Sequence, residues 1–250
     1  MAISRRYNRS KGDTMSTTNS ARITWLGHGT VLIETSRGTR ALIDPFMSQN
    51  PAFPKGFELP ARIDAILLTH AHFDHIADTV PTAAHHGSIV VAVHELAGYM
   101  ERKGVAQTMG MNLGGTVTIA DLAITMVEAK HSSSMQDEDG LHYGGVAAGF
   151  VIAVDGGPVI YHAGDTNVFG DMKLIGELYE PQVALLPIGG HYTMGPREAA
   201  LAVRLIGPAT VLPLHFGTWP PLKGTPAELT ALIDTGVEVI AWKPGEAVTL

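Results

Sequence analysis

His70-Ala71-His72-Phe73-Asp74-His75 carries more structural information than any other stretch of this chain. It holds four potential metal ligands within six residues and directly follows the apolar run Ile66-Leu67-Leu68. Residues i and i+2 of an extended chain face the same side, so His70 and His72 can bind one ion together. Asp74 and His75 are adjacent, so they need a turn or a helix start to act as ligands. They then point away from the first ion and towards a second one. The motif therefore predicts a metal site at a strand end, with two metals rather than one.

The length and composition of the chain are those of a globular protein. It has 250 residues, of which 45% are hydrophobic and 16% charged, which suffices for one large domain or two small ones. No linker-like stretch follows residue 21, so we expect one domain over 21–250 and a polar, disordered tail over 1–20. The Arg5-Arg6 pair precedes no apolar signal stretch, which predicts a cytoplasmic protein starting at Met1 or Met15.

The net charge limits the classes of partner that the chain could bind, and the absence of cysteine limits the metals. The net charge of −7 argues against a nucleic-acid-binding surface, and no segment reaches the ~18 uninterrupted apolar residues of a membrane span. We therefore expect a small-molecule substrate, with neither nucleic acid nor membrane as partner. Because the chain has no cysteine, nitrogen and oxygen must hold any metal, a donor set that suits zinc, manganese or iron. The sequence does not determine the oligomeric state, and a homo-oligomer is compatible with it.

The hydrophobic pattern predicts strands and helices in both halves. Strands are expected at 23–26, 31–34, 40–43, 63–69, 88–93, 116–119, 123–128, 146–154, 158–162, 183–187, 210–214 and 237–241, and helices at 94–102, 171–179, 196–205 and 226–234. Residues 47–60 contain three prolines and are expected to form an irregular loop. Strand-rich halves with helices between them favour two packed sheets with helices outside.

Three further ligand-type residues follow buried runs. His131 comes after the strand that ends near Glu128, Asp165 after the strand that ends at His162, and His215 after the strand that ends at Leu214. Functional side chains gather at such strand ends because the following loops are positioned by a rigid scaffold. With the first motif, the candidate set comprises five histidines and two aspartates.

Taken together, these residues resemble the metallo-β-lactamase fold superfamily. His70-x-His72-x-Asp74-His75 matches its signature, and His131, Gly164-Asp165-Thr166 and His215 stand in the order of its later motifs. The resemblance extends from about Ile23 to the C-terminus. One branch is matched further by Trp25-Leu26-Gly27-His28-Gly29-Thr30, Ile43-Asp44-Pro45, Pro187-Ile188-Gly189-Gly190 with Thr193-Met194-Gly195-Pro196, and Pro213-Leu214-His215-Phe216-Gly217-Thr218. That branch contains the L-ascorbate-6-phosphate lactonase and many uncharacterised metal-dependent hydrolases.

The resemblance implies a four-layer αββα sandwich with the metals at one edge, between the sheets. It implies that His70, His72 and His131 hold the first ion, that Asp74, His75 and His215 hold the second, and that Asp165 bridges them. The true β-lactamases use a cysteine at the second site, and this chain has none. A bridging aspartate is the pattern of the hydrolase branches.

Two divalent ions predict a hydrolytic reaction. Cations about 3.5–4 Å apart can share a water and lower its pKa from near 16 towards ~7, which yields a metal-bridging hydroxide. The residual positive charge favours a substrate whose transition state is anionic, such as an ester, lactone, thioester or phosphodiester. Asp74 can orient the hydroxide and accept its proton as well as bind metal.

Other residues have predicted supporting roles. Asp44 ends a strand and is expected to contact a ligand histidine, and His28, between two glycines, is expected to line the site. His191 follows a strand end and could contact the substrate or protonate a leaving group. The polar loop 132–143 follows His131 and is interpreted as a lid. Residues 216–223 are expected to form a pocket wall, and the helix from Pro196 could offer its N-terminus to an anionic group.

Three other interpretations remain open at this level. Relatives of the fold bind one iron and oxidise persulfides, or carry two irons, so an iron oxidoreductase is the main alternative. Nucleic-acid processing is disfavoured by the acidic charge, and a metal-binding scaffold without catalysis by the complete ligand set.

Overall fold

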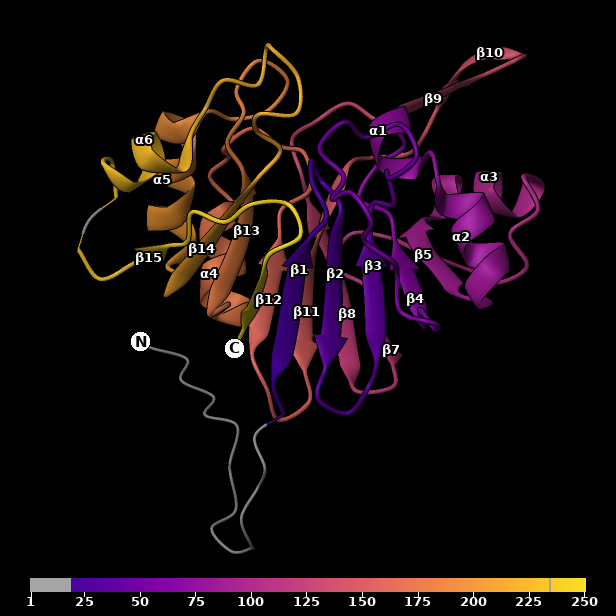
Figure 1. Ribbon diagram of the computed structural model, residues 1–250, viewed down its shortest axis with the longest axis horizontal. Coiled ribbons are helices and arrows are strands. Elements are labelled where there is room, and N and C mark those ends of the chain that lie inside the picture. The colour runs from indigo at the N-terminus through magenta and orange to yellow at the C-terminus, as the bar shows by residue number, and fades with distance from the viewer. Residues whose placement is uncertain (1–18, 234) are drawn as a thin grey trace, which may run out of the picture.

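Strands of the first half form one seven-stranded mixed sheet in the computed structural model, which describes residues 19–233 and 235–250 (Figure 1). Its strands are β1 (Ala21–Trp25), β2 (Val31–Thr35), β3 (Arg40–Ile43), β4 (Ala65–Leu67), β5 (Ile89–Val93), β6 (Thr108–Met111) and the C-terminal β16 (Ala247–Thr249). Their order is β16-β1-β2-β3-β4-β5-β6. The pairs from β16 to β3 are antiparallel, and those from β3 to β6 are parallel.

The second half forms another seven-stranded mixed sheet. Its strands are β7 (Thr116–Ile119), β8 (Leu122–Glu128), β11 (Ala148–Val154), β12 (Val159–His162), β13 (Val183–Pro187), β14 (Thr210–Leu214) and β15 (Glu238–Val239). The order is β15-β14-β13-β12-β11-β8-β7, with parallel pairs from β15 to β12 and antiparallel pairs from β12 to β7. Each sheet thus joins a parallel half to an antiparallel half.

Helices flank the two sheets and complete the expected helix–sheet–sheet–helix layers. The helices are α1 (Phe73–Ile76), α2 (Thr79–His86), α3 (His94–Arg102), α4 (Met172–Tyr179), α5 (Pro196–Ile206) and α6 (Pro226–Thr230). Figure 1 shows α2 and α3 beside the parallel strands of the first sheet, and α4 to α6 beside those of the second. In α5, proline occupies the first turn and Gly207 closes the helix at φ 73°, a left-handed conformation that glycine adopts at low cost.

Two apolar clusters hold these layers together. The larger lies between the sheets and joins Ile23, Leu32 and Ile66 of the first to Phe150 and Ile152 of the second. The smaller cluster lies between the outer face of the second sheet and the helices α4 and α5. All five residues of β13 are buried, as expected of a parallel strand that is covered on both faces.

Strand direction explains why the candidate residues meet. In the first sheet, β1, β3 and β4 run the same way, because two antiparallel steps separate β1 from β3 and β4 is parallel to β3. In the second, β8, β12 and β14 share a direction for the same reason. Parallel strands end at one edge of a sheet, so the turns that follow these six strands converge there.

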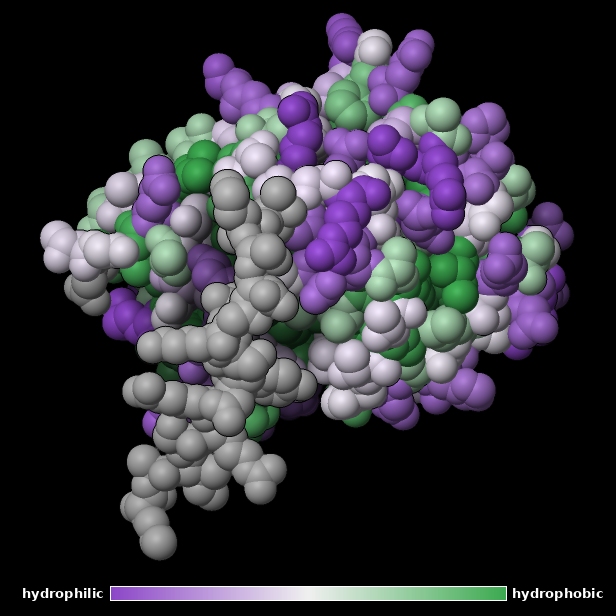
Figure 2. Space-filling view, turned by 90° about the horizontal axis from the view of Figure 1, so that it is seen from below, coloured by the Kyte–Doolittle hydropathy of each residue, from purple (hydrophilic) through white to green (hydrophobic). Residues whose placement is uncertain are grey.

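Figure 2 views the opposite end, where hydrophilic and apolar side chains are interspersed outside the grey residues.

Several sequence-based boundaries change in the structure. The predicted strand at 63–69 contracts to β4, and the helix at 226–234 to α6. The pattern missed α2, whose Pro81 is tolerated in the first turn, and the short edge strands β6 and β16. The polar loop 132–143, interpreted as a lid, contains the hairpin β9 (Ser134–Asp137) and β10 (Gly140–Tyr143).

The chain ends bear on two further expectations. Of the predicted tail, residues 1–18 lie outside the described residues, whereas Asn19 is buried and its amide donates to Asp121 over 2.7 Å. Within the described part of the chain, no helix is long and apolar enough to cross a membrane.

Candidate metal centre

The turns that carry the candidate residues have an unusual backbone. His28, Asp44 and His215 have φ values of 56°, 48° and 52°, in the left-handed region that side chains other than glycine rarely occupy. Each follows the end of a strand at the same edge of its sheet. Such a conformation costs on the order of 1–3 kcal/mol and persists where the surroundings fix it, typically at functional sites.

Three histidines converge to form the first cluster. His70 Nε2 lies 3.1 Å from His72 Nδ1, and His131 Nε2 lies 3.3 Å from the same atom. Two nitrogens that each bind a tetrahedral zinc at ~2.0–2.1 Å are about 3.4 Å apart. The three ligand atoms thus already have nearly the separation that a single ion requires, and they fit a metal.

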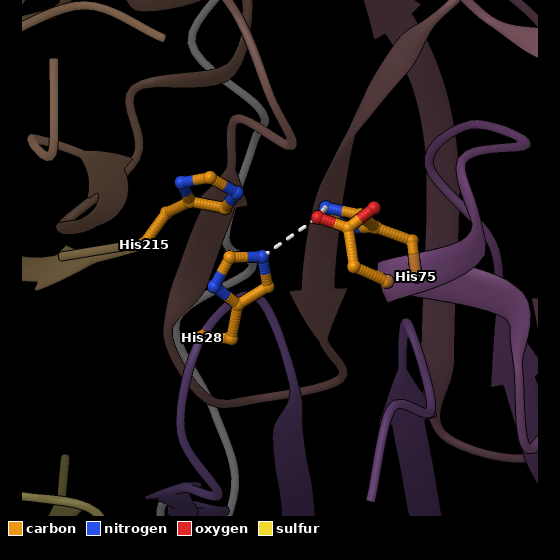
Figure 3. A group of neighbouring side chains, drawn as sticks. His28, His75 and His215 are labelled. Carbon is orange, nitrogen blue, oxygen red and sulfur yellow. Dashed lines mark hydrogen bonds and ion pairs between the residues drawn. The ribbon is translucent and has the colours of Figure 1, made fainter. Parts of the chain in front are cut away.

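A second cluster gathers beside the first. Ligand atoms of Asp74, His75 and His215 lie within 4.8 Å of one another, and His28 belongs to the same group. Figure 3 shows His28 on the turn after β1, His75 on α1 and His215 at the end of β14, with their rings facing a common space. The dashed line marks the 2.9 Å hydrogen bond from His28 Nε2 to Asp74 Oδ2.

Asp165 lies between the two clusters. Its Oδ2 is 3.1 Å from His215 Nε2 and 3.5 Å from His75 Nε2 of the second cluster, and 3.8 Å from His131 Nε2 of the first. Among predicted site residues, it therefore has the position expected of a bridging carboxylate.

Asp44 orients histidines of both clusters. Its Oδ2 accepts hydrogen bonds from His75 Nδ1, at 2.8 Å, and from Thr69 Oγ1, at 2.6 Å. Because the Thr69 hydroxyl donates to Asp44, it accepts from His70 Nδ1, which is 3.0 Å away. With a metal bound, protons on both Nδ1 atoms would leave Nε2 of His70 and of His75 free to ligate it.

The buried ring nitrogens of the second cluster support a metal there. His75 Nε2 and His215 Nε2 are buried and have no hydrogen-bond partner in the part of the chain that the structure describes. His215 Nε2 is close to Asp165 but lacks the alignment of a hydrogen bond. Buried polar atoms are nearly always satisfied, so orphaned nitrogens beside two carboxylates fit a cation.

The charge balance of the metal-free site agrees with this. Burial, opposed by the hydrogen bond to Asp74, lowers the pKa of His28 to about 4, so its ring is neutral at pH 7 and Nε2 carries a proton for Asp74. Burial disfavours ionised Asp74, but His28 and His75 outweigh it and hold the pKa of Asp74 below its usual value. Although burial disfavours protonated His75, Asp165 and Asp44 raise its pKa well above the ordinary value. Charged His75 thus supplies positive charge that a metal would otherwise provide.

Close packing requires a glycine beside His75. A Cβ on Gly29 would lie 2.7 Å from His75 Cε1, closer than nonbonded carbons approach. This contact explains why the turn carries glycine next to His28.

Two predicted residues differ from the rest in their surroundings. His28 was expected only to line the site, yet it belongs to the second cluster, with its Nδ1 3.0 Å from Thr218 Oγ1. His191 is not brought to the clusters: its side chain is exposed, and its neighbour Tyr192 lines the cavity instead. A leaving-group proton from His191 stays a prediction.

The hairpin β9–β10 forms one side of the cavity over the clusters. Ser134, Gln136 and Leu141 line the cavity, while Asp137 faces α3. Asp137 Oδ2 accepts hydrogen bonds from Lys103 Nζ, at 3.0 Å, and from Tyr99 Oη, at 3.2 Å. Lys103 lowers the pKa of Asp137, which stays ionised. Movement of this segment as a lid stays a prediction; in the structure it is a hairpin anchored to α3 through Asp137.

Sequence reasoning missed Thr69 and Thr218. Thr69 directly precedes the metal motif, and this position could have identified it as a link to a histidine. No local pattern identified Thr218, because it lies 190 residues from His28 in the sequence and only the fold brings the two side chains together.

Comparisons with known proteins agree with this geometry. The family model described as the beta-lactamase superfamily domain matches residues 39–216. A protein of Koribacter versatilis, named UPF0173 metal-dependent hydrolase, is 47% identical over 225 residues, which cover 90% of this chain and 96% of that protein. Its namesake in Thermococcus kodakarensis is 49% identical over 232 residues, 92% of this chain and 99% of the relative.

A solved structure has the same fold. The structure of a metallo hydrolase from the archaeon Ignicoccus hospitalis superposes with a TM-score of 0.80 and is 36% identical, covering 92% of this chain and 98% of that one. The two mixed sheets flanked by helices are the metallo-β-lactamase fold, as the motifs predicted.

Replacing Asp44 by asparagine tests its role in orienting the ligands. Either orientation of the amide would place an NH₂ group against a donor, Thr69 N on one side or Thr69 Oγ1 and His75 Nδ1 on the other. We expect Asp44→Asn to weaken Zn²⁺ affinity about 10–100-fold in a chelator competition assay. Asp121→Asn changes a buried aspartate at the other end of β8 and should leave the affinity unchanged; equal affinity in both variants would contradict the role.

The metal-free protein should lose stability as the pH falls from about 6.5 to 4.5. Burial is the largest cause that lowers the pKa of His28, His70, His72, His131 and His162, whereas that of His75 alone is raised. Unfolding therefore takes up protons in this range, and stability falls by about 1.4 kcal/mol per pH unit for each net proton. Urea unfolding in chelator measures the slope. His28→Asn should reduce it and exposed His85→Asn should not; stability that rises on acidification would refute the assignment.

Proposed function

The chain belongs to the UPF0173 metal-dependent hydrolase family within the metallo-β-lactamase superfamily, and on that premise we propose that it hydrolyses a small ester-like molecule with two divalent metal ions as cofactors. The substrate classes that fit are esters, lactones, thioesters and phosphodiesters. In each, water adds across the scissile bond. Esters, thioesters and phosphodiesters release an acid together with an alcohol or thiol, and a lactone opens to one hydroxy acid.

The observation that carries the proposal is the pairing of two ligand clusters through one carboxylate. His70, His72 and His131 would hold one ion, and the second would lie among Asp74, His75 and His215. Asp165 Oδ2 is within 4 Å of histidine nitrogens from both groups. Zinc and manganese suit these nitrogen and oxygen donors. When bound, two such ions lower the pKa of water towards ~7 and so supply a nucleophile at neutral pH.

The side chains around the ions have distinct tasks. Asp74 lines the cavity and is ionised, so it can orient an attacking water and accept its proton. His28 fixes the rotamer of Asp74 by donating from Nε2, and Thr218 fixes the ring of His28 in turn. Asp44 and Thr69 hold His75 and His70 in the tautomers that ligation needs.

Hydrolytic activity of the loaded protein tests the proposal. We expect Zn²⁺- or Mn²⁺-loaded protein to hydrolyse at least one member of a panel of lactones, thioesters, carboxylic esters, phosphodiesters and β-lactams, and chelation to abolish the activity. His72→Ala should lower kcat/KM by at least about 100-fold, because it removes a ligand from the first cluster. His85→Ala, an exposed histidine on α2, serves as the control and should keep full activity.

Two results would count against the proposal. Equal activity in His72→Ala and the unmodified protein would place the reaction elsewhere. Oxygen consumption with persulfides by the iron-loaded protein, without hydrolysis of any panel member, would favour the oxidoreductase alternative.

A further inference from the structure

The walls of the cavity differ in character from its floor. The cavity has a volume of about 640 Å³, a size that suits a small organic molecule. Five of its lining residues are candidate metal ligands or the bridging carboxylate, namely His72, Asp74, His131, Asp165 and His215. The remaining lining residues are neutral, and they are Phe73, Ser132, Ser134, Gln136, Leu141, Tyr192 and Trp219.

One part of the wall is apolar and comes from four separate segments. Phe73 on α1, Leu141 on β10 and Tyr192 after β13 are 59%, 72% and 56% exposed, and Trp219 follows β14. Exposed apolar side chains that cluster around a cavity mark a binding surface, whereas scattered ones carry no such meaning. Their convergence over the ligand clusters suits the non-reacting part of a substrate.

Packing behind this wall holds Trp219 in place. Its ring lies 4.6 Å from the His28 ring and 6.0 Å from the Phe46 ring, and the Phe73 ring lies 6.2 Å away. Because His28 also contacts Asp74, the aromatic wall and the second cluster share one packed unit. An aromatic ring fixed in this way offers a flat surface on which a planar or apolar group can stack.

In the part of the chain that the structure describes, the cavity wall carries no lysine or arginine. Lys103, near the hairpin, is engaged by Asp137, and Lys130, beside His131, by Glu128. At the N-terminus of α5, which the sequence suggested for an anionic group, Gly195 N donates to the Glu198 carboxylate over 3.2 Å, and neither Gly195 nor Arg197 lines the cavity. The described residues offer no counter-ion for a second negative charge on the substrate.

From these observations we propose that the cavity selects a substrate whose non-reacting part is uncharged and apolar or aromatic, and discriminates against one that carries an additional carboxylate or phosphate. The inference rests on the proposed function. It assigns the negative charge that is expected of the substrate's transition state to the reacting group alone. Bound metal ions would supply the positive charge of the cavity, whereas Ser132, Ser134 and Gln136 offer only neutral hydrogen bonds. An anionic group against the apolar wall would lose its hydration without gaining a partner.

Binding of matched hydroxamates to the zinc-loaded protein tests the proposal. Acetohydroxamate, benzohydroxamate and 4-carboxybenzohydroxamate share the metal-binding group and differ only in the tail. We expect benzohydroxamate to bind about tenfold more tightly than either of the others in isothermal titration calorimetry, because only its tail is both uncharged and an aromatic ring that can stack on the wall. A carboxylated tail that binds as tightly as the neutral one, or a methyl tail that equals the phenyl ring, would overturn the proposal.

A pair of variants provides a second, independent readout. Leu141→Lys places a cation on the cavity wall, whereas Leu178→Lys changes an equally exposed leucine on α4, outside the cavity lining; the two side chains are 72% and 71% exposed. We expect Leu141→Lys to tighten binding of 4-carboxybenzohydroxamate by at least about threefold, the scale of an exposed ion pair, and Leu178→Lys to leave it unchanged. An unchanged affinity in Leu141→Lys would contradict the assignment of this wall.

These measurements separate the two proposals. Hydroxamate binding needs the metal ions but no turnover, so a reversed tail preference refutes the substrate class and leaves hydrolysis standing. Absence of hydrolysis across the panel refutes the proposed function, whatever the tail preference.

Discussion

The site depends on the hydrogen bonds that one buried carboxylate accepts. Asp44 is fully buried, and its two oxygens accept from Thr69 N, Thr69 Oγ1 and His75 Nδ1. A buried carboxylate is tolerated only when it is so satisfied, and here the same bonds orient His75 directly and His70 through Thr69. The pairing that makes this possible is the parallel register of β3 and β4, which sets Ile43 opposite Leu67 and brings the two following turns together. Ligands of both clusters thus depend on one strand pair.

Most strands and helices and the candidate ligand residues could be predicted from local sequence, whereas the four-layer fold and the grouping of the ligands were implied by the resemblance to the superfamily. The six-residue motif, the apolar runs before it and the ligand-type residues at later strand ends rest on spacing and periodicity, which are local properties. The structure brings His70, His72, Asp74, His75, His131 and His215 into two adjoining clusters, with Asp165 between them and Asp44 in contact with His75. Strand direction then accounts for their meeting, because six strands that share a direction within their sheets end at the site.

The remaining features depend on contacts between distant segments. His28 gave only a weak signal between two glycines. Its membership of the second cluster follows from the hydrogen bond of His215 N to His28 O and from the approach of Thr218 to its ring. The hairpin β9–β10 has a polar sequence, and its position is set by Asp137 against Lys103 and Tyr99 of α3 rather than by local propensity. The short strands β6 and β16 likewise form by pairing with β5 and β1. The walls of the cavity also depend on contacts between distant segments. The sequence therefore indicated the class of reaction better than the substrate.

Metal stoichiometry tests the central claim most directly, namely that ligands from both sheets assemble two adjoining metal sites. Protein loaded with Zn²⁺, dialysed and analysed by mass spectrometry should contain two ions per chain. His131→Ala and His215→Ala should each retain about one, because each removes a ligand from a different cluster. A single ion in the unmodified protein, lost entirely from either variant, would contradict the account and favour a mononuclear centre.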